Sequence, residues 1–303
     1  MSQQPCPSPA CAQAEGAIAR IIEPRTRDLG GFSVRRVLPA PGQRAVGPFV
    51  FFDEMGPATF DPGHGIDVRP HPHIGLATLT YLFEGEIMHR DSLGVVQPIR
   101  PGAVNWMTAG RGIVHSERTG DEERARTSRL HGIQSWIALP REQEEVEPAF
   151  FHHGAGSLPV LERDGATLRL IVGEAFGERS PVAALSPMFY LAAELTEGAR
   201  LPLPADLGER AVYVVSGSVT VAGIGYESGR MLIAADGVDV EITAAADSRL
   251  MLLGGAPLDG PRHLWWNLLS TRPERIEQAR QDWKEGRFDP VPGETEFIPL
   301  PED

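Results

Sequence analysis

The chain contains very little cysteine and almost no lysine. Cys6 and Cys11 are its two cysteines and both lie near the N-terminus, so a disulfide framework through the body of the protein is excluded, and their C-x4-C spacing alone is a weak zinc signal. Lys284 is the only lysine among 28 basic residues, and 41 acidic residues bring the net charge to −13. Because phosphate contacts need clustered Lys and Arg, we expect no direct binding of nucleic acid.

Long apolar runs are missing as well. No segment of the 303 residues approaches the roughly 18 consecutive apolar residues of a membrane span. The N-terminus lacks the basic stretch and following apolar stretch of a secretory signal, so we expect a cytoplasmic protein without a membrane partner. Residues 1–18 are small, polar and proline-bearing, and we expect them to form a disordered tail.

Glycine and proline, in contrast, punctuate the whole chain, with 33 and 27 residues. Between them lie short apolar runs rich in β-branched and aromatic residues, of which Thr78 to Leu82 (TLTYL) is typical. This pattern predicts an all-β protein of many short strands joined by turns. The expected strands are 49–52, 77–83, 95–99, 104–107, 133–139, 168–172, 188–195, 211–215, 219–221, 231–234, 238–242 and 250–253.

The strands fall into two similar halves, separated by the charged run REQEEVE at 141–147. Such a run is typical of a solvated loop or short helix. We therefore expect an N-terminal domain at 19–145 and a C-terminal domain at 146–303. The second includes a helix at about 272–285, for which Thr271 and Glu274 have the spacing of a capping box, with Trp283 as a packing anchor on the apolar face.

Histidines cluster in the first half of the chain. His71 and His73 lie at i and i+2, so both imidazoles would point to one face of a strand. His115 and Glu117 repeat this spacing with a carboxylate. Two such pairs on neighbouring strands would bring four N and O donors to one point, as a divalent metal requires.

The surroundings of these pairs resemble two known sequence motifs. The frame of Gly65, His71-x-His73 and Gly85 matches the first cupin motif, and the frame of Gly102 and His115 approximates the second. In detail the chain resembles the pirins, a branch of the cupin superfamily, from about residue 20 to residue 290. The similar segments are RPHPHIGLATLTYLFEGEIMHRDSLG at 69–94, PGAVNWMTAGRGIVHSE at 101–117, LHGIQSWIALP at 130–140 and ERIEQARQDWKEGRF at 274–288.

The resemblance implies a bicupin, with two antiparallel β-barrel or jelly-roll domains. It also implies one mononuclear metal in the N-terminal domain, usually iron, held by His71, His73, His115 and Glu117. A set of three histidines and one glutamate also accepts Mn, Co, Ni, Cu or Zn. The C-terminal domain has no histidine between Gly154 and Arg262. We therefore expect it to lack a metal.

The chain departs from the pirin pattern directly after the first ligand pair. Pirins commonly read HPHRGFET there, whereas this chain has Ile74, Leu76 and Ala77 in place of the Arg, Phe and Glu. The general cupin motif also expects a Glu ligand near Ala77. Its absence fits the pirin site, in which the fourth ligand follows the last histidine, but the three changes would alter the surroundings of the ligands or the mouth of the cavity.

Several other polar side chains have weaker claims on the site. His89 is expected to bond Asp91 or backbone and not the metal, and His64 to be exposed on a loop. For His131 and Gln134 a role in holding the metal ligands and simple packing are both open. Trp106 and Met107 are expected to form a buried wall. His152 and His153 are expected on a solvated linker.

The resemblance implies a dioxygenase of the quercetin 2,3-dioxygenase type, acting with O2 on a flavonol or a similar enol-bearing aromatic. Such an enzyme cleaves the 2,3 bond of the flavonol and releases carbon monoxide. Iron held by His and carboxylate with open coordination positions suits such chemistry. Glu117 would then tune the charge of the metal or remove the substrate proton as a base. The alternative is a metal- or redox-sensing regulatory protein that binds a protein partner. A third reading, a structural protein with a vestigial site, is disfavoured by the four intact ligands.

Overall fold

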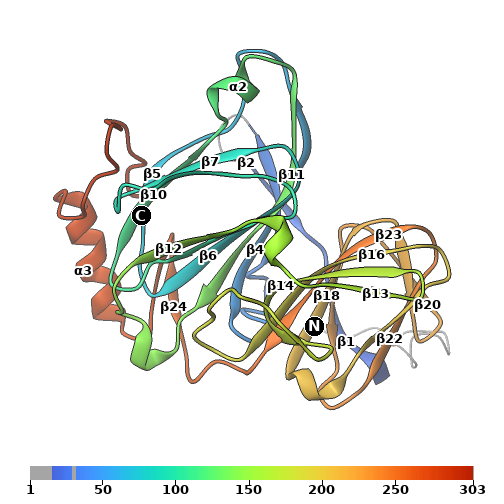
Figure 1. Ribbon diagram of the computed structural model, residues 1–303. Coiled ribbons are helices and arrows are strands. Elements are labelled where there is room, and N and C mark those ends of the chain that lie inside the picture. The colour runs from blue at the N-terminus through green and yellow to red at the C-terminus, as the bar shows by residue number, and fades with distance from the viewer. Residues whose placement is uncertain (1–15, 29–31, 303) are drawn as a thin grey trace. The chain divides into compact units, whose positions relative to one another are not determined.

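The structure is a computed structural model that describes residues 16–28 and 32–302. These residues form two compact units, each built almost entirely of antiparallel strands (Figure 1). The histidine unit comprises residues 26–39, 49–157 and 258–302, and the second unit comprises residues 16–25, 40–48 and 158–257. Most of the expected tail at 1–18 lies outside the described residues, but Ile18 begins strand β1 of the second unit.

Two sheets make up most of the histidine unit. Its seven-stranded sheet has the order β12-β9-β6-β11-β4-β3-β2, and its four-stranded sheet has the order β5-β10-β7-β8. A small hairpin, β24-β25, and the helix α3 complete it. Its elements are β2 (Arg25–Asp28), β3 (Ser33–Leu38), β4 (Phe49–Phe60), β5 (Asp67–His73), β6 (Leu76–Glu84), β7 (Ile87–Asp91), β8 (Val96–Ile99), β9 (Val104–Thr108), β10 (Ile113–Arg118), α2 (Asp121–Arg124), β11 (Ser128–Ala138), η1 (Arg141–Gln143), β12 (Ala149–His153), η2 (Ala155–Ser157), β24 (His263–Trp265), β25 (Leu268–Ser270) and α3 (Pro273–Lys284).

The second unit repeats this plan with an eight-stranded and a four-stranded sheet. The larger sheet has the order β1-β21-β18-β23-β16-β14-β13, with β15 paired to β14, and the smaller one has the order β17-β22-β19-β20. Its elements are β1 (Ile18–Ile22), β13 (Val160–Arg163), β14 (Ala166–Ala175), β15 (Glu178–Arg179), β16 (Met188–Leu195), β17 (Arg200–Leu203), η3 (Ala205–Leu207), β18 (Glu209–Ser216), β19 (Ser218–Val221), β20 (Ile224–Glu227), β21 (Met231–Ala234), β22 (Val240–Ala244) and β23 (Ser248–Gly255).

The all-β prediction is confirmed, and the two units differ in what fills them. A buried cluster of Leu, Val, Ile, Ala and aromatic side chains, including Leu170, Val214 and Leu250, fills the core of the second unit. Burial of such apolar area is the main stabilising contribution to a fold of this kind. In the histidine unit a smaller apolar cluster around Met55, Leu82 and Ile99 occupies one part of the interior. Further buried apolar side chains, such as Phe52 and Leu79, and a group of buried polar side chains occupy the rest.

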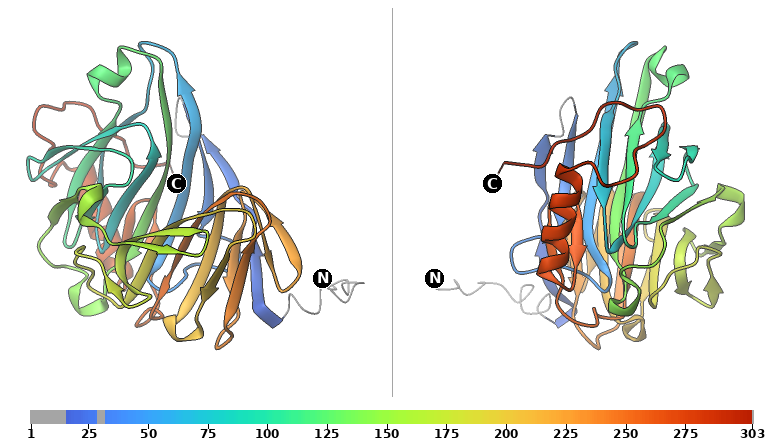
Figure 2. Two further views of the ribbon diagram at one scale, coloured as in Figure 1. Left: turned by 45° about the vertical axis from the view of Figure 1, so that its right-hand side comes forward. Right: turned by 90° about the vertical axis from the view of Figure 1, so that its left-hand side faces the viewer.

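The units are not continuous ranges of the sequence, whereas the expected domains were. Strand β1 pairs with β21, so the first described strand belongs to the second unit. The C-terminal hairpin and α3 belong to the histidine unit instead of the half in which they occur in sequence. Figure 2 shows α3 and the C-terminal segment in red, and this segment reaches β5, because Ile298 N donates to the carbonyl oxygen of Pro70. Pairings between such distant segments leave no local trace in composition.

Helix α3 forms as expected, but its predicted capping box is wrong. The N-cap is Arg272, and no side chain caps the helix. The Thr271 hydroxyl lies one residue before the N-cap and donates to the carboxylate of Glu144 at 2.8 Å. Pro273 starts the helix with a φ that already suits it. Ile276 and the other buried residues of α3 pack against Leu268 of β25.

The expected linker at His152 and His153 is also wrong. Both residues lie in β12, which pairs with β9 at the edge of the seven-stranded sheet. The apolar neighbours Phe150 and Phe151 sit opposite Met107 and Trp106, which explains why this segment joins the sheet. The sequence pattern did not indicate this strand, because two adjacent polar histidines are not typical of one.

The described residues include no helix with the length and apolar character needed to cross a membrane.

Candidate metal centre

Three of the four predicted ligands come together inside the histidine unit. His71 and His73 lie on β5, and His115 lies on β10, which pairs with β5 so that His115 is opposite His71. One ring nitrogen from each lies within 4.8 Å of the others. All three side chains are buried. Among the described residues this is the only group of three or more potential metal-binding side chains at such spacing.

The turn after β5 passes very close to the β24-β25 hairpin. Gly75 has φ of +70°, and a Cβ on it would collide with the backbone oxygen of Leu269. A glycine is therefore required for the chain to pass so close to the β24-β25 hairpin. The same approach brings the carbonyl of Asn267 to within 3.0 Å of His73 Nδ1.

Each histidine has its Nδ1 held by a neighbour. His71 Nδ1 is 2.9 Å from the carbonyl oxygen of Arg69, and His73 Nδ1 donates to Asn267. His115 Nδ1 lies 3.4 Å from Nδ1 of His89. Because a carbonyl only accepts, the protons of His71 and His73 are on Nδ1, and their Nε2 atoms carry lone pairs.

The freed Nε2 atoms face one another. Nε2 of His73 and Nε2 of His115 are 3.1 Å apart in a buried setting. Nε2 of His73 carries no proton, so two bare acceptors meet and repel at this distance if His115 also carries its proton on Nδ1. A divalent cation bound by both lone pairs removes this conflict. The donor set therefore fits a metal ion.

Burial keeps the three imidazoles neutral. It lowers the pKa of His71 to about 4, although the carbonyl of Arg69 opposes the shift. For His73 and His115 burial, followed by the neighbouring histidines, lowers the pKa well below 6.5. Neutral imidazole is the form that binds metal. The site is therefore ready for a metal at neutral pH.

Glu117, the fourth predicted ligand, is near this cluster but does not belong to it. Its carboxylate turns toward β6, where Thr80 Oγ1 is 3.3 Å from Glu117 Oε1. Thr80 also bonds Gln134 Oε1 at 2.7 Å, and Gln134 bonds the Glu117 carboxylate. Burial raises the pKa of Glu117, while these hydrogen bonds and His89 oppose the rise. Glu117 is thus a buried, oriented carboxyl group beside the histidines.

A row of polar side chains crosses the seven-stranded sheet on the face that contacts Glu117. Cross-strand pairing aligns them in the order Arg36, Asp53, Gln134, Thr80, Asn105 and His152. Arg36 binds Asp53 through two hydrogen bonds of 2.9 and 2.8 Å. His152 Nδ1 bonds Asn105 Oδ1 at 2.7 Å. The interior facing the site is therefore polar and ordered by hydrogen bonds.

The remaining polar residues singled out in the sequence lie at different distances from the histidine cluster. His64 is exposed, and His89 bonds Asp91 at 3.0 Å, as expected. Gln134 touches Glu117 and so helps to hold the site, whereas His131 bonds Glu54 at 2.8 Å. Glu54 pairs with Ile133, one position from Gln134, so it points to the opposite face of the sheet.

The two expected wall residues take different faces of β9. Trp106 is almost fully buried and donates to Thr108, and it pairs with Leu79, on the face opposite to Thr80. Met107 pairs with Thr78, which shares the face of Thr80, and is equally buried. Both residues are packed within the unit, as a buried wall requires.

The three departures from the pirin pattern are packing residues. Leu76 and Ala77 are fully buried. Ile74 packs with Ile276 and Ala279 of α3 in an apolar cluster on the back of the site. The arginine of the common pattern is thus replaced by a contact to the helix.

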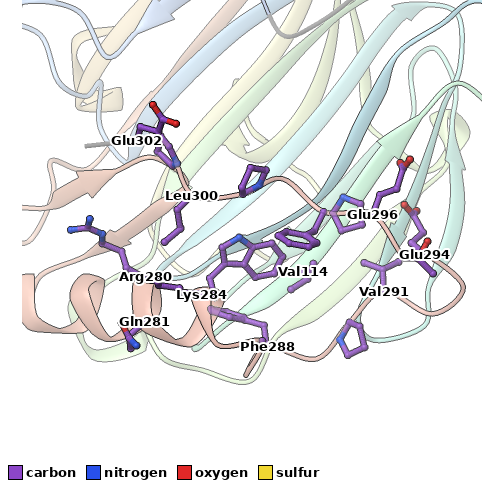
Figure 3. A pocket seen from close by; sticks show the side chains of 18 of the residues that line it. Val114, Arg280, Gln281, Lys284, Phe288, Val291, Glu294, Glu296, Leu300 and Glu302 are labelled. Atoms are coloured by element: carbon purple, nitrogen blue, oxygen red, sulfur yellow. The ribbon is translucent and has the colours of Figure 1, made fainter.

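A pocket lies behind the strands that carry the histidines. It has a volume of about 690 Å³ and runs between α3 and the C-terminal segment at 286–302 (Figure 3). Its wall includes Pro70 and Val114, the residues directly before His71 and His115. The C-terminal segment is anchored there, because Ile298 N donates to Pro70 O at 2.8 Å and Arg118 donates to Glu294 at 2.7 Å.

Sequence reasoning missed the residues that hold the ligands from afar. Asn267 is 194 positions from His73, and Glu294 is 178 positions from Ser116, to which it is hydrogen-bonded. A local signal exists in the sequence only for His89 and Asp91, whose i, i+2 spacing places both side chains on one face of a strand.

Comparison with known proteins agrees with this architecture. The family model for pirin matches residues 31–137, and the model for the pirin C-terminal cupin domain matches residues 190–289. A pirin-like protein of Caulobacter vibrioides is 52% identical over 286 residues, covering 93% of this chain and 99% of that protein. Rat pirin is 34% identical, covering 85% of this chain and 88% of its own.

A solved structure shows the same fold. The crystal structure of a quercetin 2,3-dioxygenase from Acinetobacter baumannii superimposes with a TM-score of 0.87 at 35% identity. The match covers 93% of this chain and 95% of that one. Family models, relatives and fold agree along nearly the whole chain, and this protein is therefore a member of the pirin family with a bicupin fold.

Proposed function

We propose that this protein is a metal-dependent dioxygenase of the quercetin 2,3-dioxygenase type, with iron as its metal. His71, His73 and His115 would hold the metal through Nε2, and Glu117 would be the fourth ligand. The substrate would be a flavonol or another aromatic with an enol oxygen, and O2 the oxidant. The observation that carries the proposal is the pair of buried Nε2 atoms 3.1 Å apart with their Nδ1 atoms occupied.

The protein's own groups would bind and orient the substrate. When bound, iron would supply a Lewis acid and a redox centre for the reaction with O2. Trp136 stacks on Phe51 with ring centroids 3.9 Å apart and lies edge-on to His73 at 5.1 Å, which gives the site an aromatic wall. A largely buried site excludes bulk water and strengthens the electrostatic interactions within it.

Glu117 would have two roles. A carboxylate whose pKa is raised by burial is a better base toward an enol proton than an exposed one. Thr80 and Gln134 hold the carboxyl group beside the histidines. The similarity to the Acinetobacter baumannii protein, whose title names quercetin 2,3-dioxygenase, supports this substrate class.

The proposal is tested with protein that has been reconstituted anaerobically with iron. On admission of air, wild-type protein should consume quercetin, whereas His73→Ala should not. The loss of the visible absorbance of quercetin measures this consumption. His64→Ala, a change of an exposed histidine, is the matched control and should retain activity. Stoichiometric iron without any loss of quercetin or a related enol would contradict the proposal.

The same assay separates the alternative function. A metal- or redox-sensing regulator that binds a protein partner predicts stoichiometric metal binding without flavonol turnover. Iron-dependent turnover at catalytic rates favours the enzyme.

A further inference from the structure

The three histidines differ in what holds their Nδ1 atoms. His71 and His73 are held by backbone carbonyls, which are fixed acceptors. His115 is held by a side chain, because its Nδ1 contacts Nδ1 of His89 at 3.4 Å, within hydrogen-bond distance. An imidazole nitrogen accepts only if it carries no proton, so His115 depends on the tautomer of His89.

That tautomer is set by Asp91. His89 Nε2 lies 3.0 Å from Asp91 Oδ2, and both side chains are almost completely buried. A carboxylate only accepts, so the proton of His89 is on Nε2 and its Nδ1 is a bare acceptor. His115 then donates from Nδ1 and presents a lone pair at Nε2, next to Nε2 of His73.

Asp91 is itself held in place by its own turn. Its Oδ1 accepts the backbone N–H groups of Leu93 at 2.9 Å and Val95 at 3.1 Å. Phe150 stacks on the His89 ring with centroids 4.4 Å apart and an interplanar angle of 21°. The carboxylate and the ring are therefore both fixed, which a chain of this kind needs in order to orient a ligand.

We propose that His89 and Asp91 are positioning residues that fix His115 in the tautomer required for metal binding, through the chain Asp91 Oδ2, His89 and His115 Nδ1. The inference rests on the metal site of the proposed function. His89 and Asp91 would thus belong to the residues that form that site. A His115 held by this chain is also a stronger electron donor, because the carboxylate polarises both rings.

Asp91→Asn tests the chain without breaking the turn. The asparagine oxygen replaces Oδ1 and still accepts from Leu93 and Val95, whereas its NH2 replaces Oδ2 and donates to His89 Nε2. His89 must then carry its proton on Nδ1, which opposes the Nδ1 proton of His115. His89→Phe keeps a ring against Phe150 and removes the acceptor. Asp91→Asn should therefore oppose a proton on Nδ1 of His115, and His89→Phe should leave that nitrogen without its acceptor.

His131→Phe is the matched control. His131 also bonds a buried carboxylate, Glu54, at 2.8 Å, but on the opposite face of the sheet. Its loss should disturb packing to a similar degree and leave the metal site unchanged.

The experiment titrates each purified full-length protein with Co²⁺ against a competing chelator and records the visible spectrum. Asp91→Asn and His89→Phe should weaken binding about 10- to 100-fold and alter the Co²⁺ bands, whereas His131→Phe should match wild type. Wild-type affinity and spectrum in both variants would overturn the inference and leave the proposed function standing. Absence of Co²⁺ binding by wild-type protein would overturn both.

A second measurement needs no variant to fold. Long-range ¹H–¹⁵N NMR of the histidine rings in Zn²⁺-loaded wild-type protein reports which nitrogen carries each proton. The inference predicts a proton on Nε2 of His89 and on Nδ1 of His115. A proton on Nδ1 of His89 would overturn it.

Discussion

At the scale of single residues, the metal site depends on nitrogen lone pairs that are placed by the other side of each ring. His73 is bonded through Nδ1 to a backbone carbonyl and offers Nε2 to the centre. His73→Ala removes one of three clustered donors, so we expect the protein to lose most of its metal affinity and to remain folded. Metal analysis after gel filtration checks this, and retained stoichiometric metal would contradict the ligand assignment.

Glu117→Gln makes a separate prediction for the fourth ligand. The amide keeps the size of the carboxyl group and its contacts with Thr80 and Gln134, but it carries no charge. We expect weaker metal binding, with a loss smaller than in His73→Ala, and a large loss of turnover. Glu84→Gln, at the partly exposed end of the same β6, is the control. Equal affinity and turnover in Glu117→Gln and wild type would exclude Glu117 as a ligand and as a base.

The lowered pKa values predict how metal binding responds to acid. A site of exposed histidines would lose metal as the pH falls through about 6.5. Here His71 has a pKa of about 4, and His73 and His115 are also shifted down, so protons compete only under more acid conditions. We expect the affinity for Zn²⁺ to change little between about pH 8 and pH 6 and to fall steeply below about pH 5. A steady fall from pH 7 would contradict the buried, neutral state.

The same shifts predict the acid stability of the metal-free protein. Unfolded histidines bind protons below about pH 6.5 whereas the buried ones do not, so their contribution to stability is complete above that pH and is lost on acidification toward pH 4. The raised pKa of Glu117 has the opposite sign, because its folded form binds the proton more tightly. Urea unfolding between pH 7 and pH 5 should show a net fall in stability, since five histidines with a lowered pKa oppose two carboxyl groups with a raised one, Glu117 and Asp53.

At the scale of elements, strands β5 and β10 are supported from behind by the C-terminal segment. Glu294 binds Ser116 and Arg118, the two neighbours of Glu117, and its side chain is only 10% exposed. Glu294→Ala leaves Arg118 without its best partner and should lower the free energy of unfolding by about 1.5–3 kcal/mol. Glu296→Ala is the control, because Glu296 is 61% exposed and binds the same arginine at 3.1 Å.

Exposed ion pairs contribute about 0–1 kcal/mol, so the control should change little. Urea unfolding of both variants and of wild type decides the matter. Equal effects of the two changes would show that the segment does not support β10 through Glu294.

The elements also show which parts of the fold were readable from sequence. Strand β6 was predicted because its residues are β-branched, aromatic and apolar, a local property. Strand β12 was missed because two histidines concealed a segment whose apolar partners, Met107 and Trp106, lie more than 40 positions away. The capping role assigned to Thr271 failed for the same reason, since its real partner, Glu144, lies 127 positions away.

At the scale of the whole molecule, the two units share a plan but not a chemistry. The clustering of His71, His73 and His115 was predictable because i, i+2 spacing on paired strands brings side chains to one face. The residues that hold this region were not predictable, because Asn267, which bonds His73, and Glu294, which bonds Ser116, lie near the far end of the chain. The second unit has kept the two-sheet architecture around an apolar core.

Metal binding should stabilise the molecule as a whole. A ligand that binds only the folded state stabilises it by about 2.7 kcal/mol at a free concentration of 100 times its Kd. We expect Zn²⁺ to raise the Tm of wild-type protein and a chelator to reverse the rise. Calorimetry measures both changes. His73→Ala should show no such rise, and an equal rise in that variant would place the bound metal elsewhere.

The central claim is that the histidine unit supports oxidative ring cleavage of an enol-bearing aromatic. The most direct test measures carbon monoxide released and O2 consumed by the iron-loaded protein acting on quercetin. The account predicts one molecule of carbon monoxide for each molecule of O2, abolished by His73→Ala. Quercetin that stays intact, or is oxidised without release of carbon monoxide, would contradict it.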